Sequence, residues 1–173
     1  MRIENIVYEN VKANKEIDFY VPVRIDYKDN YEKVLFYYRL LNQKFSFIEF
    51  SIGSITRKIA SITIISINDI VEVDKEVVEK LDIVGELGNP RIDRALFEQE
   101  HIITDNVNFK IMLHEKKIYF ICNSELIKNK ITMENFDIIL NYKNDIVGYI
   151  FNGFTEKEWN EINESIYASI SWK

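Results

Sequence analysis

The residue types that most often carry acid-base or metal chemistry are scarce in this sequence. It contains two histidines, His101 and His114, and one cysteine, Cys122. Histidine titrates near neutral pH and is a frequent metal ligand, and a cysteine beside a histidine can act as a nucleophile. The two histidines share no helical spacing, and nothing in the sequence places Cys122 beside either of them. Cys122 also follows the apolar run KIYFI, where a cysteine usually packs as a small apolar residue.

Short motifs that bind phosphate or carry a nucleophile are also missing. The patterns G-x-S-x-G, GxxxxGK[ST] and G-x-G-x-x-G do not occur. Gly85 and Gly88 lie in VGELGNP, which has neither the spacing nor the lysine of a phosphate-binding loop. A single cysteine excludes an intrachain disulfide and a zinc site with several cysteines. We therefore expect no catalytic residue, no cofactor and no metal, and a protein that is not an enzyme.

One carboxylate stands inside an apolar pattern. Glu49, in FIEF, falls on the same side of an expected strand as Phe45 and Phe47. If that side is buried, the pKa of Glu49 should rise, and the residue becomes a candidate for a site. If that side faces solvent, Glu49 is an ordinary surface residue.

Four further acids gather around an expected helix that starts at Asp74. Glu76 and Glu79 lie on the side opposite its valines, and Glu72 and Asp74 come just before it. Such a cluster could dock a basic partner. It could equally stabilise the positive end of the helix dipole, with Glu76 pairing with Lys80 one turn later.

The overall charge bears on the class of partner. Lys and Arg number 22 and Asp and Glu 28, so the formal net charge is -6. Binding to a phosphate backbone depends on cationic side chains, so nucleic acid is not an expected partner. A basic protein is compatible with this charge, although a modest negative charge also favours solubility.

Length and hydropathy predict one soluble domain, residues 1–173. The composition, 47% apolar and 29% charged, is typical of globular proteins. No apolar run approaches the roughly 20 residues that cross a bilayer. The first residues, MRIENIVYENVKANKEIDF, lack the apolar core of a signal peptide. We therefore expect a cytoplasmic protein without a membrane partner.

The segment Tyr31–Leu41 shows the period of two that is typical of a strand. Its two sides are both apolar in part: Val34, Phe36, Tyr38 and Leu40 form one side, and Leu35, Tyr37 and Leu41 belong to the other. The second side needs cover from a helix, another sheet or another chain. Tyrosine is a favoured residue of protein interfaces. Tyr31, Leu35 and Tyr37 are therefore candidates for binding a partner.

Consecutive strands joined by short polar links predict a large antiparallel sheet. A less regular strand is expected at Ile17–Ile25, and three hairpins follow in the chain. Their expected strands are Phe45–Ile52 with Lys58–Ile67, Asn108–Leu113 with Lys117–Cys122, and Phe136–Tyr142 with Asp145–Phe151.

One to three helices should accompany this sheet. The clearest one follows Thr155, because Glu158 three residues later completes a capping box. Phe154 and Trp159 have the spacing of a hydrophobic staple, and Trp159, Ile162, Ile166 and Ile170 form an apolar stripe. The helix from Asp74 should bury Val77, Val78, Leu81 and Val84 and end at Gly85. Asn89 and Pro90 could open a third helix through RIDRALFEQ.

Three stretches resemble small bacterial immunity proteins. FIEFSIGSITRKIASITII is similar to their hairpin, which reads roughly "EI-turn-tGxIxxITL", although Arg57 stands where that pattern has glycine. GELGNPRID is similar to their Gly-x-Pro link, and FDIILNYKNDIVGYIFNGFTEKEWNEI to their closing hairpin and helix start. The resemblance implies an α+β protein that binds and occludes one secreted toxin, and it implies no catalytic residues.

The sequence thus favours a protein of α+β fold, a mainly antiparallel sheet with a C-terminal amphipathic helix, that binds another protein without catalysis. The expected contact residues are Tyr31, Leu35, Tyr37, Glu72, Asp74, Glu76 and Glu79. The partner would be a protein, and a toxin of basic charge would suit the acidic set. The alternatives are a small-ligand protein or enzyme with a pocket in a curled sheet, and a homodimer joined through the sheet.

Overall fold

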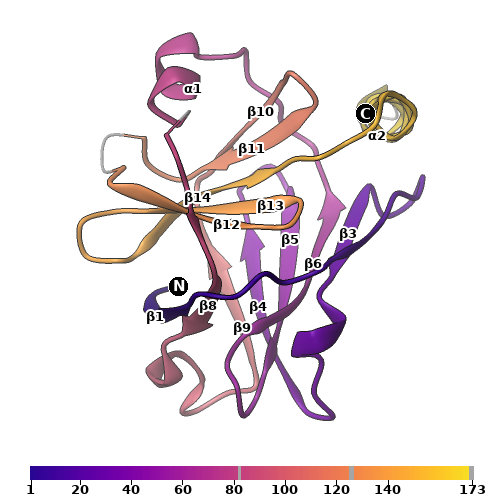
Figure 1. Ribbon diagram of the computed structural model, residues 1–173. Coiled ribbons are helices and arrows are strands. Elements are labelled where there is room, and N and C mark those ends of the chain that lie inside the picture. The colour runs from indigo at the N-terminus through magenta and orange to yellow at the C-terminus, as the bar shows by residue number, and fades with distance from the viewer. Residues whose placement is uncertain (82, 125–126, 172–173) are drawn as a thin grey trace.

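The chain folds into two six-stranded sheets, a small two-stranded sheet and two α-helices (Figure 1). The computed structural model describes residues 1–81, 83–124 and 127–171, with side chains as far as residue 168. We call the first six-stranded sheet the N-terminal sheet. Its strands, in spatial order, are β2 (Asn14–Glu16), β3 (Val23–Asp26), β6 (Ile59–Ser66), β5 (Phe47–Gly53), β4 (Leu35–Leu41) and β9 (Ile102–Asn106).

The second large sheet, which we call the C-terminal sheet, is built mostly from the later half of the chain. Its strands, in spatial order, are β10 (Lys110–His114), β11 (Lys117–Ile121), β14 (Ile146–Phe151), β13 (Phe136–Leu140), β12 (Asn129–Met133) and β7 (Glu86–Leu87). The small sheet pairs β1 (Ile3–Val7) with β8 (Asn89–Ile92). The helical elements are α1 (Lys75–Leu81), α2 (Glu156–Ser171) and the short 3₁₀ helices η1 (Lys28–Asn30) and η2 (Arg94–Phe97).

The two large sheets pack face to face over the main hydrophobic core, and their strands run steeply across one another in Figure 1. Phe50 of β5 contacts Phe136 and Tyr149 of the C-terminal sheet, with ring centroids 6.2 and 4.9 Å apart. Ile162 and Ile166 of α2 join this core. Helix α1 instead covers the outer side of the C-terminal sheet, where Val77 and Leu81 pack in a second cluster.

All three predicted hairpins are confirmed: β5 pairs with β6, β10 with β11 and β13 with β14, each antiparallel. The turn between β10 and β11 has two residues of positive φ, Glu115 and Lys116. Two successive residues of positive φ give the type I′ turn, whose twist matches that of the flanking strands. Asn144 takes a positive φ in the turn after β13, a conformation that asparagine tolerates.

The capping box of α2 is confirmed. The Thr155 backbone N–H and hydroxyl both donate to the Glu158 carboxylate, and the Glu158 N–H donates to the Thr155 hydroxyl. Phe154 and Trp159 are in contact, with ring centroids 6.0 Å apart. The buried stripe is confirmed for Ile162 and Ile166, and the side chain of Ile170 lies outside the described part.

The sheets are not purely antiparallel, which corrects the predicted pairing. β9 pairs in parallel with β4, and the two-residue strand β7 pairs in parallel with β12. Both β9 and β7 lie at a sheet edge. Parallel neighbours need long crossover connections, so hairpin spacing in the sequence could not indicate them.

The third helix, predicted from Asn89, is wrong. Residues Asn89–Ile92 form β8, and only the single 3₁₀ turn η2 follows. Asp93, rather than Asn89, caps this turn by accepting a hydrogen bond from Ala95 N–H. Pro90 lies in a short strand at a sheet edge, where its missing N–H is tolerated.

Other differences concern the ends of elements. β4 begins at Leu35, so Tyr31 and Val34 precede the strand, and Val34 is exposed rather than buried. Only residues 23–25 of the predicted Ile17–Ile25 strand are extended in a sheet, as part of β3. Pro22 lacks an N–H, and Asp18 accepts a hydrogen bond from Tyr20 N–H. Val84 follows the end of α1 and is 96% exposed, so its predicted burial is wrong.

Candidate functional site

The outer side of the N-terminal sheet carries apolar side chains that no described element covers. We call this surface the open face. It contains half-buried and exposed side chains that belong to neither hydrophobic cluster: Leu35, Tyr37, Leu41, Phe47 and Ile102. Tyr37 lies between its register partners, Ser51 on β5 and Ile102 on β9. The opposite layer differs, since α1 packs on the outer side of the C-terminal sheet.

Two of the three aromatic and aliphatic residues predicted to bind a partner lie on this surface. Leu35 and Tyr37 are on the open face. Tyr31 lies before β4 and is 70% exposed. Val34 and Ile55 are also exposed. They lie close to each other, because the Ser54 N–H donates to the Val34 carbonyl. Leu35 and Tyr37 therefore share the open face, whereas Tyr31 lies outside the strand.

Glu49 is also on the open face, where Arg39 is its cross-strand partner. The Arg39 Nε donates to Glu49 Oε2 at 2.7 Å, and both side chains are partly exposed. Of the two readings of this residue, the structure favours a solvated surface position over a buried site. Together, Arg39 and Glu49 give the open face a charged pair among its apolar residues.

The predicted acidic residues lie elsewhere. Glu72, Asp74, Glu76 and Glu79 are all exposed on or before α1, over the C-terminal sheet. Asp74 caps this helix, because its Oδ1 accepts a hydrogen bond from Val77 N–H, and Glu76 pairs with Lys80 at 2.8 Å. The acidic set and the open face therefore belong to different layers and do not form one surface.

The histidines and the cysteine do not meet. The His101 ring packs at 76° to the Phe36 ring, with centroids 5.1 Å apart, and His114 lies at the β10–β11 turn beside Glu115. Burial raises the pKa of the half-buried Cys122 to about 11, so the thiol is protonated at neutral pH. Across the described residues no group of three or more His, Cys, Asp or Glu side chains could hold a metal.

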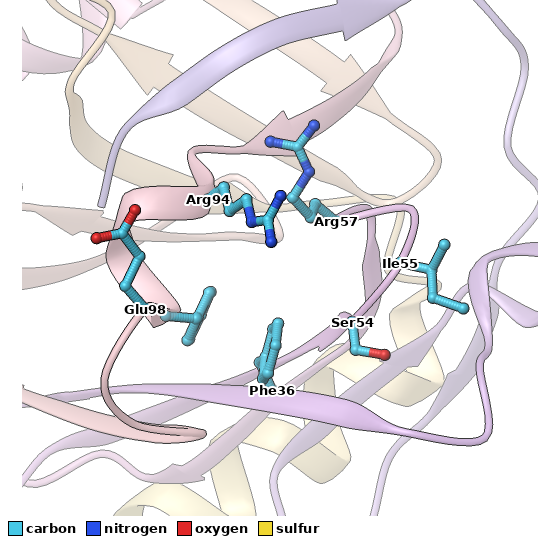
Figure 2. A pocket seen from close by; sticks show the side chains of 7 residues that line it. Phe36, Ser54, Ile55, Arg57, Arg94 and Glu98 are labelled. Atoms are coloured by element: carbon cyan, nitrogen blue, oxygen red, sulfur yellow. The ribbon is translucent and has the colours of Figure 1, made fainter.

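A cavity of about 680 Å³ lies at one end of the sheet pair, next to β4. We call it the end pocket; it is lined by Phe36, Ser54, Ile55, Arg57, Arg94, Phe97 and Glu98 (Figure 2). Phe36 of β4 and Phe97 of η2 stack at its base, with centroids 4.7 Å apart and an angle of 14° between the rings. The β5–β6 turn supplies Ser54, Ile55 and Arg57 as the facing wall.

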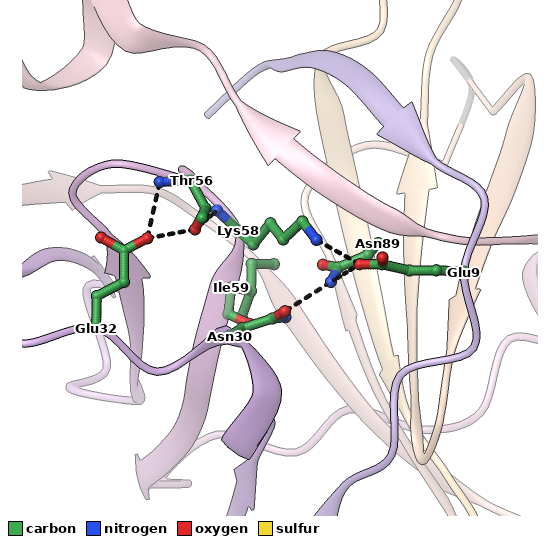
Figure 3. Close-up of polar contacts among 7 residues, drawn as sticks. All are labelled: Glu9, Asn30, Glu32, Thr56, Lys58, Ile59 and Asn89. Carbon is green, nitrogen blue, oxygen red and sulfur yellow. Dashed lines mark hydrogen bonds and ion pairs between the residues drawn. The ribbon is translucent and has the colours of Figure 1, made fainter.

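Glu32 fixes this wall. Its carboxylate accepts hydrogen bonds from the backbone N–H groups of Ile55 and Thr56 and from the hydroxyls of Ser54 and Thr56. Figure 3 shows the bonds from Thr56. Partial burial acts to raise the pKa of Glu32, but these hydrogen bonds outweigh it, so the pKa lies below its usual value. The carboxylate is therefore charged at neutral pH, and the turn is held in one conformation.

Arg57 occupies an unfavourable backbone position in this turn. Its φ is 60°, in the left-handed region, which costs an ordinary residue about 1–2 kcal/mol relative to the right-handed one. Glycine would avoid this cost. The Arg57 guanidinium pairs with Glu4 of β1 at 2.6 Å, which offsets part of it.

A buried polar cluster supports the start of β6 beneath the turn. The Asn30 amide donates to the Ile59 carbonyl, and the Asn89 amide donates to Asn30 Oδ1 and to Glu9, which also pairs with Lys58 (Figure 3). Asn30 and Asn89 are both buried. This cluster ties η1, β6 and β8 together, so it positions the walls of the end pocket and has no access to a ligand of its own.

Sequence reasoning did not find the end pocket. Its residues come from three separate stretches of the chain, and none of them forms a motif. The one signal was Arg57, which replaces the glycine expected at that turn position. No helix within the described ranges is long and apolar enough to span a membrane. No family model matches this chain, and no curated protein matches it in sequence.

Proposed function

We propose that this protein binds another protein, without catalysis, through the open face. One observation carries the proposal: Leu35, Tyr37, Leu41, Phe47 and Ile102 point to the same side of the N-terminal sheet and belong to neither hydrophobic cluster. Apolar side chains gathered on one exposed face are costly in water and often mark interaction sites in soluble proteins. Side chains of a strand point alternately to its two sides, so polar residues in place of Leu35, Tyr37 and Leu41 would not have changed the core.

The composition of the open face suits a protein partner. Interfaces are enriched in tyrosine, phenylalanine and arginine, and Tyr37, Phe47 and Arg39 are present here. Tyrosine gives a large contact area with few rotatable bonds, so little side-chain entropy is lost on binding. Tyr37 is therefore the expected centre of the contact.

The resemblance to small bacterial immunity proteins suggests a more specific function: the protein would occlude one toxin in the cytoplasm. The net charge of -6 would speed the approach of a basic toxin. The exposed acids around α1 would contribute to this long-range attraction without lying in the contact itself. The partner would be held by complementary shape and charge, so one molecule of protein would neutralise one molecule of toxin.

The experiment uses the products of the two genes that flank the one encoding this chain. Each product is purified and mixed with the protein, and the complex is measured by size exclusion with light scattering and by calorimetry. We expect a one-to-one complex with one of them. Tyr37→Thr replaces one residue that favours strands by another and should weaken binding at least about tenfold, as for an interface anchor.

Two controls make the test specific. Tyr142→Thr removes an exposed tyrosine at the turn after β13 and should leave binding unchanged. Glu72→Gln, Glu76→Gln and Glu79→Gln together should slow association and reduce its salt dependence, with a smaller effect on dissociation. The proposal is wrong if neither product binds, or if Tyr37→Thr binds as tightly as the natural protein. A chain that is dimeric alone, and monomeric as Tyr37→Thr, would assign the open face to a homodimer instead.

A further inference from the structure

The end pocket combines positive charge with an aromatic base. Among the described residues, the Arg94 guanidinium makes no hydrogen bond or ion pair, and its side chain is exposed at the rim. Figure 2 shows this guanidinium directed into the space above Phe36, beside the stem of Arg57. The carboxylate of Glu98, the acidic residue of the lining, points away from that space. The interior of the pocket is therefore cationic.

The opposite side of the pocket is apolar and flat. Phe36 and Phe97 stack with nearly parallel rings, and the His101 ring packs against Phe36 at an angle of 76°. A planar ligand can rest on such a base, because offset stacking of aromatic rings is favourable. Ser54 and Ile55 of the β5–β6 turn line the facing wall.

The walls are set before any ligand arrives. Glu32 holds the β5–β6 turn by four hydrogen bonds, and Asp93 caps η2, which carries Arg94. A site with fixed walls loses little entropy on binding. The volume of about 680 Å³ lies within the range typical of small-molecule pockets, about 300–1,000 Å³.

We propose that the end pocket binds a small organic oxyanion: a carboxylate or phosphate carried on a flat aromatic body. Arg94 pairs with the anionic group through its planar guanidinium, whose donors match both kinds of oxyanion. The positive charge of Arg57 adds to the attraction, although Glu4 holds its guanidinium. The aromatic body lies against Phe36. This site is separate from the open face, because Phe36 and Tyr37 point to opposite sides of β4.

The test uses phenyl phosphate and benzoate as probes, with inorganic phosphate and benzyl alcohol for comparison. Backbone amide shifts of the ¹⁵N-labelled protein are followed by NMR at low ionic strength. We expect saturable shifts in residues 54–57 and 94–98 with phenyl phosphate and benzoate. Inorganic phosphate and benzyl alcohol should bind at least about tenfold more weakly, because each lacks one half of the contact.

Variants identify the residues responsible. Arg94→Gln removes an exposed guanidinium and should weaken phenyl phosphate binding about tenfold or more. Arg57→Gly removes a guanidinium at a backbone position that glycine prefers, and should cause a smaller loss. The matched control is Arg24→Gln on β3, which removes another exposed arginine, paired with Asp26, and should change nothing.

Each contrary outcome is decisive. The proposal is overturned if neither aromatic anion produces saturable shifts, or if Arg94→Gln binds phenyl phosphate as the natural protein does. Equal affinity for phenyl phosphate and inorganic phosphate would show that the aromatic ring of the ligand does not contribute to binding. None of these results bears on the partner test, because Tyr37→Thr leaves the lining of the end pocket intact.

Discussion

Asp137 on β13 is a buried acid with one oxygen left without a donor. It is 6% exposed; Asn152 donates to its Oδ2 at 3.0 Å, and Lys130 lies 3.8 Å from the same oxygen. Its Oδ1 is buried and accepts no hydrogen bond within the described residues. Burial raises the pKa of Asp137 above its usual value, and Thr132, Lys130 and Asn152 offset this only in part. The folded protein therefore keeps this proton to a higher pH than the unfolded chain does.

This shift has a defined effect on stability. Because the folded state binds the proton more tightly, the free energy of unfolding falls as the pH rises from 3.8, the ordinary value, through the raised pKa. Asp137→Asn removes this dependence. We expect the stability of Asp137→Asn relative to the natural protein to be higher at pH 7 than at pH 4, as measured by urea unfolding across that interval.

The control is Asp29→Asn, which removes an exposed carboxylate from η1. Its stability difference from the natural protein should change less with pH. If the difference for Asp137→Asn stays constant between pH 4 and 7, the folded state does not hold the proton more tightly, and burial of Asp137 is without consequence.

At the scale of elements, the sequence predicted the structures that depend on residues close together in the chain. The hairpins follow from period-two patterns and polar links, and the start of α2 follows from Thr155 and Glu158. The regions that failed depend on distant partners. β8 is a strand because β1, more than 80 residues earlier in the chain, pairs with it, and β9 forms beside β4. The end pocket was missed for the same reason, since Phe36, Arg57 and Arg94 meet only in the folded chain.

The β5–β6 turn depends on a residue outside the hairpin. Glu32 accepts hydrogen bonds from Ser54, Ile55 and Thr56. Hydrogen bonds to a charged group contribute about 1.5–3 kcal/mol in proteins, and less at exposed sites. We expect Glu32→Ala to lower the free energy of unfolding by about 1–3 kcal/mol, measured by urea unfolding at pH 7.

The control is Glu100→Ala, which also removes one carboxylate but from an exposed position after η2. It should change stability little. Equal stabilities of Glu32→Ala and Glu100→Ala would mean that the turn keeps its conformation without the carboxylate. The low pKa of Glu32 adds a pH dependence: its contribution is present above the ordinary glutamate value of 4.5 and is lost as the pH falls through the lowered pKa.

At the scale of the whole molecule, aromatic contacts join the two large sheets. Phe50 is fully buried and contacts Tyr38 in its own sheet and Phe136 and Tyr149 in the other. Replacing a buried phenylalanine by alanine leaves a cavity and typically costs about 3–5 kcal/mol. We expect Phe50→Ala to lose about this much stability, measured by urea unfolding.

Phe45→Ala removes the same ring from an exposed position two residues before β5 and serves as the matched comparison. It should change the free energy of unfolding by less than about 0.5 kcal/mol. A loss below about 1 kcal/mol for Phe50→Ala would indicate that the sheets repack around the vacated space.

The division of the two large sheets along the chain affects synthesis on the ribosome. β2 to β6 lie within residues 14–66, but the strands that bury their apolar side begin at residue 110 and end at residue 151. At about 5–20 residues per second, the nascent polypeptide waits on the order of ten seconds for this cover. During that interval its isoleucine-rich strands are open to self-association and to chaperones, so the yield of native protein should depend on how fast the ribosome completes the second half.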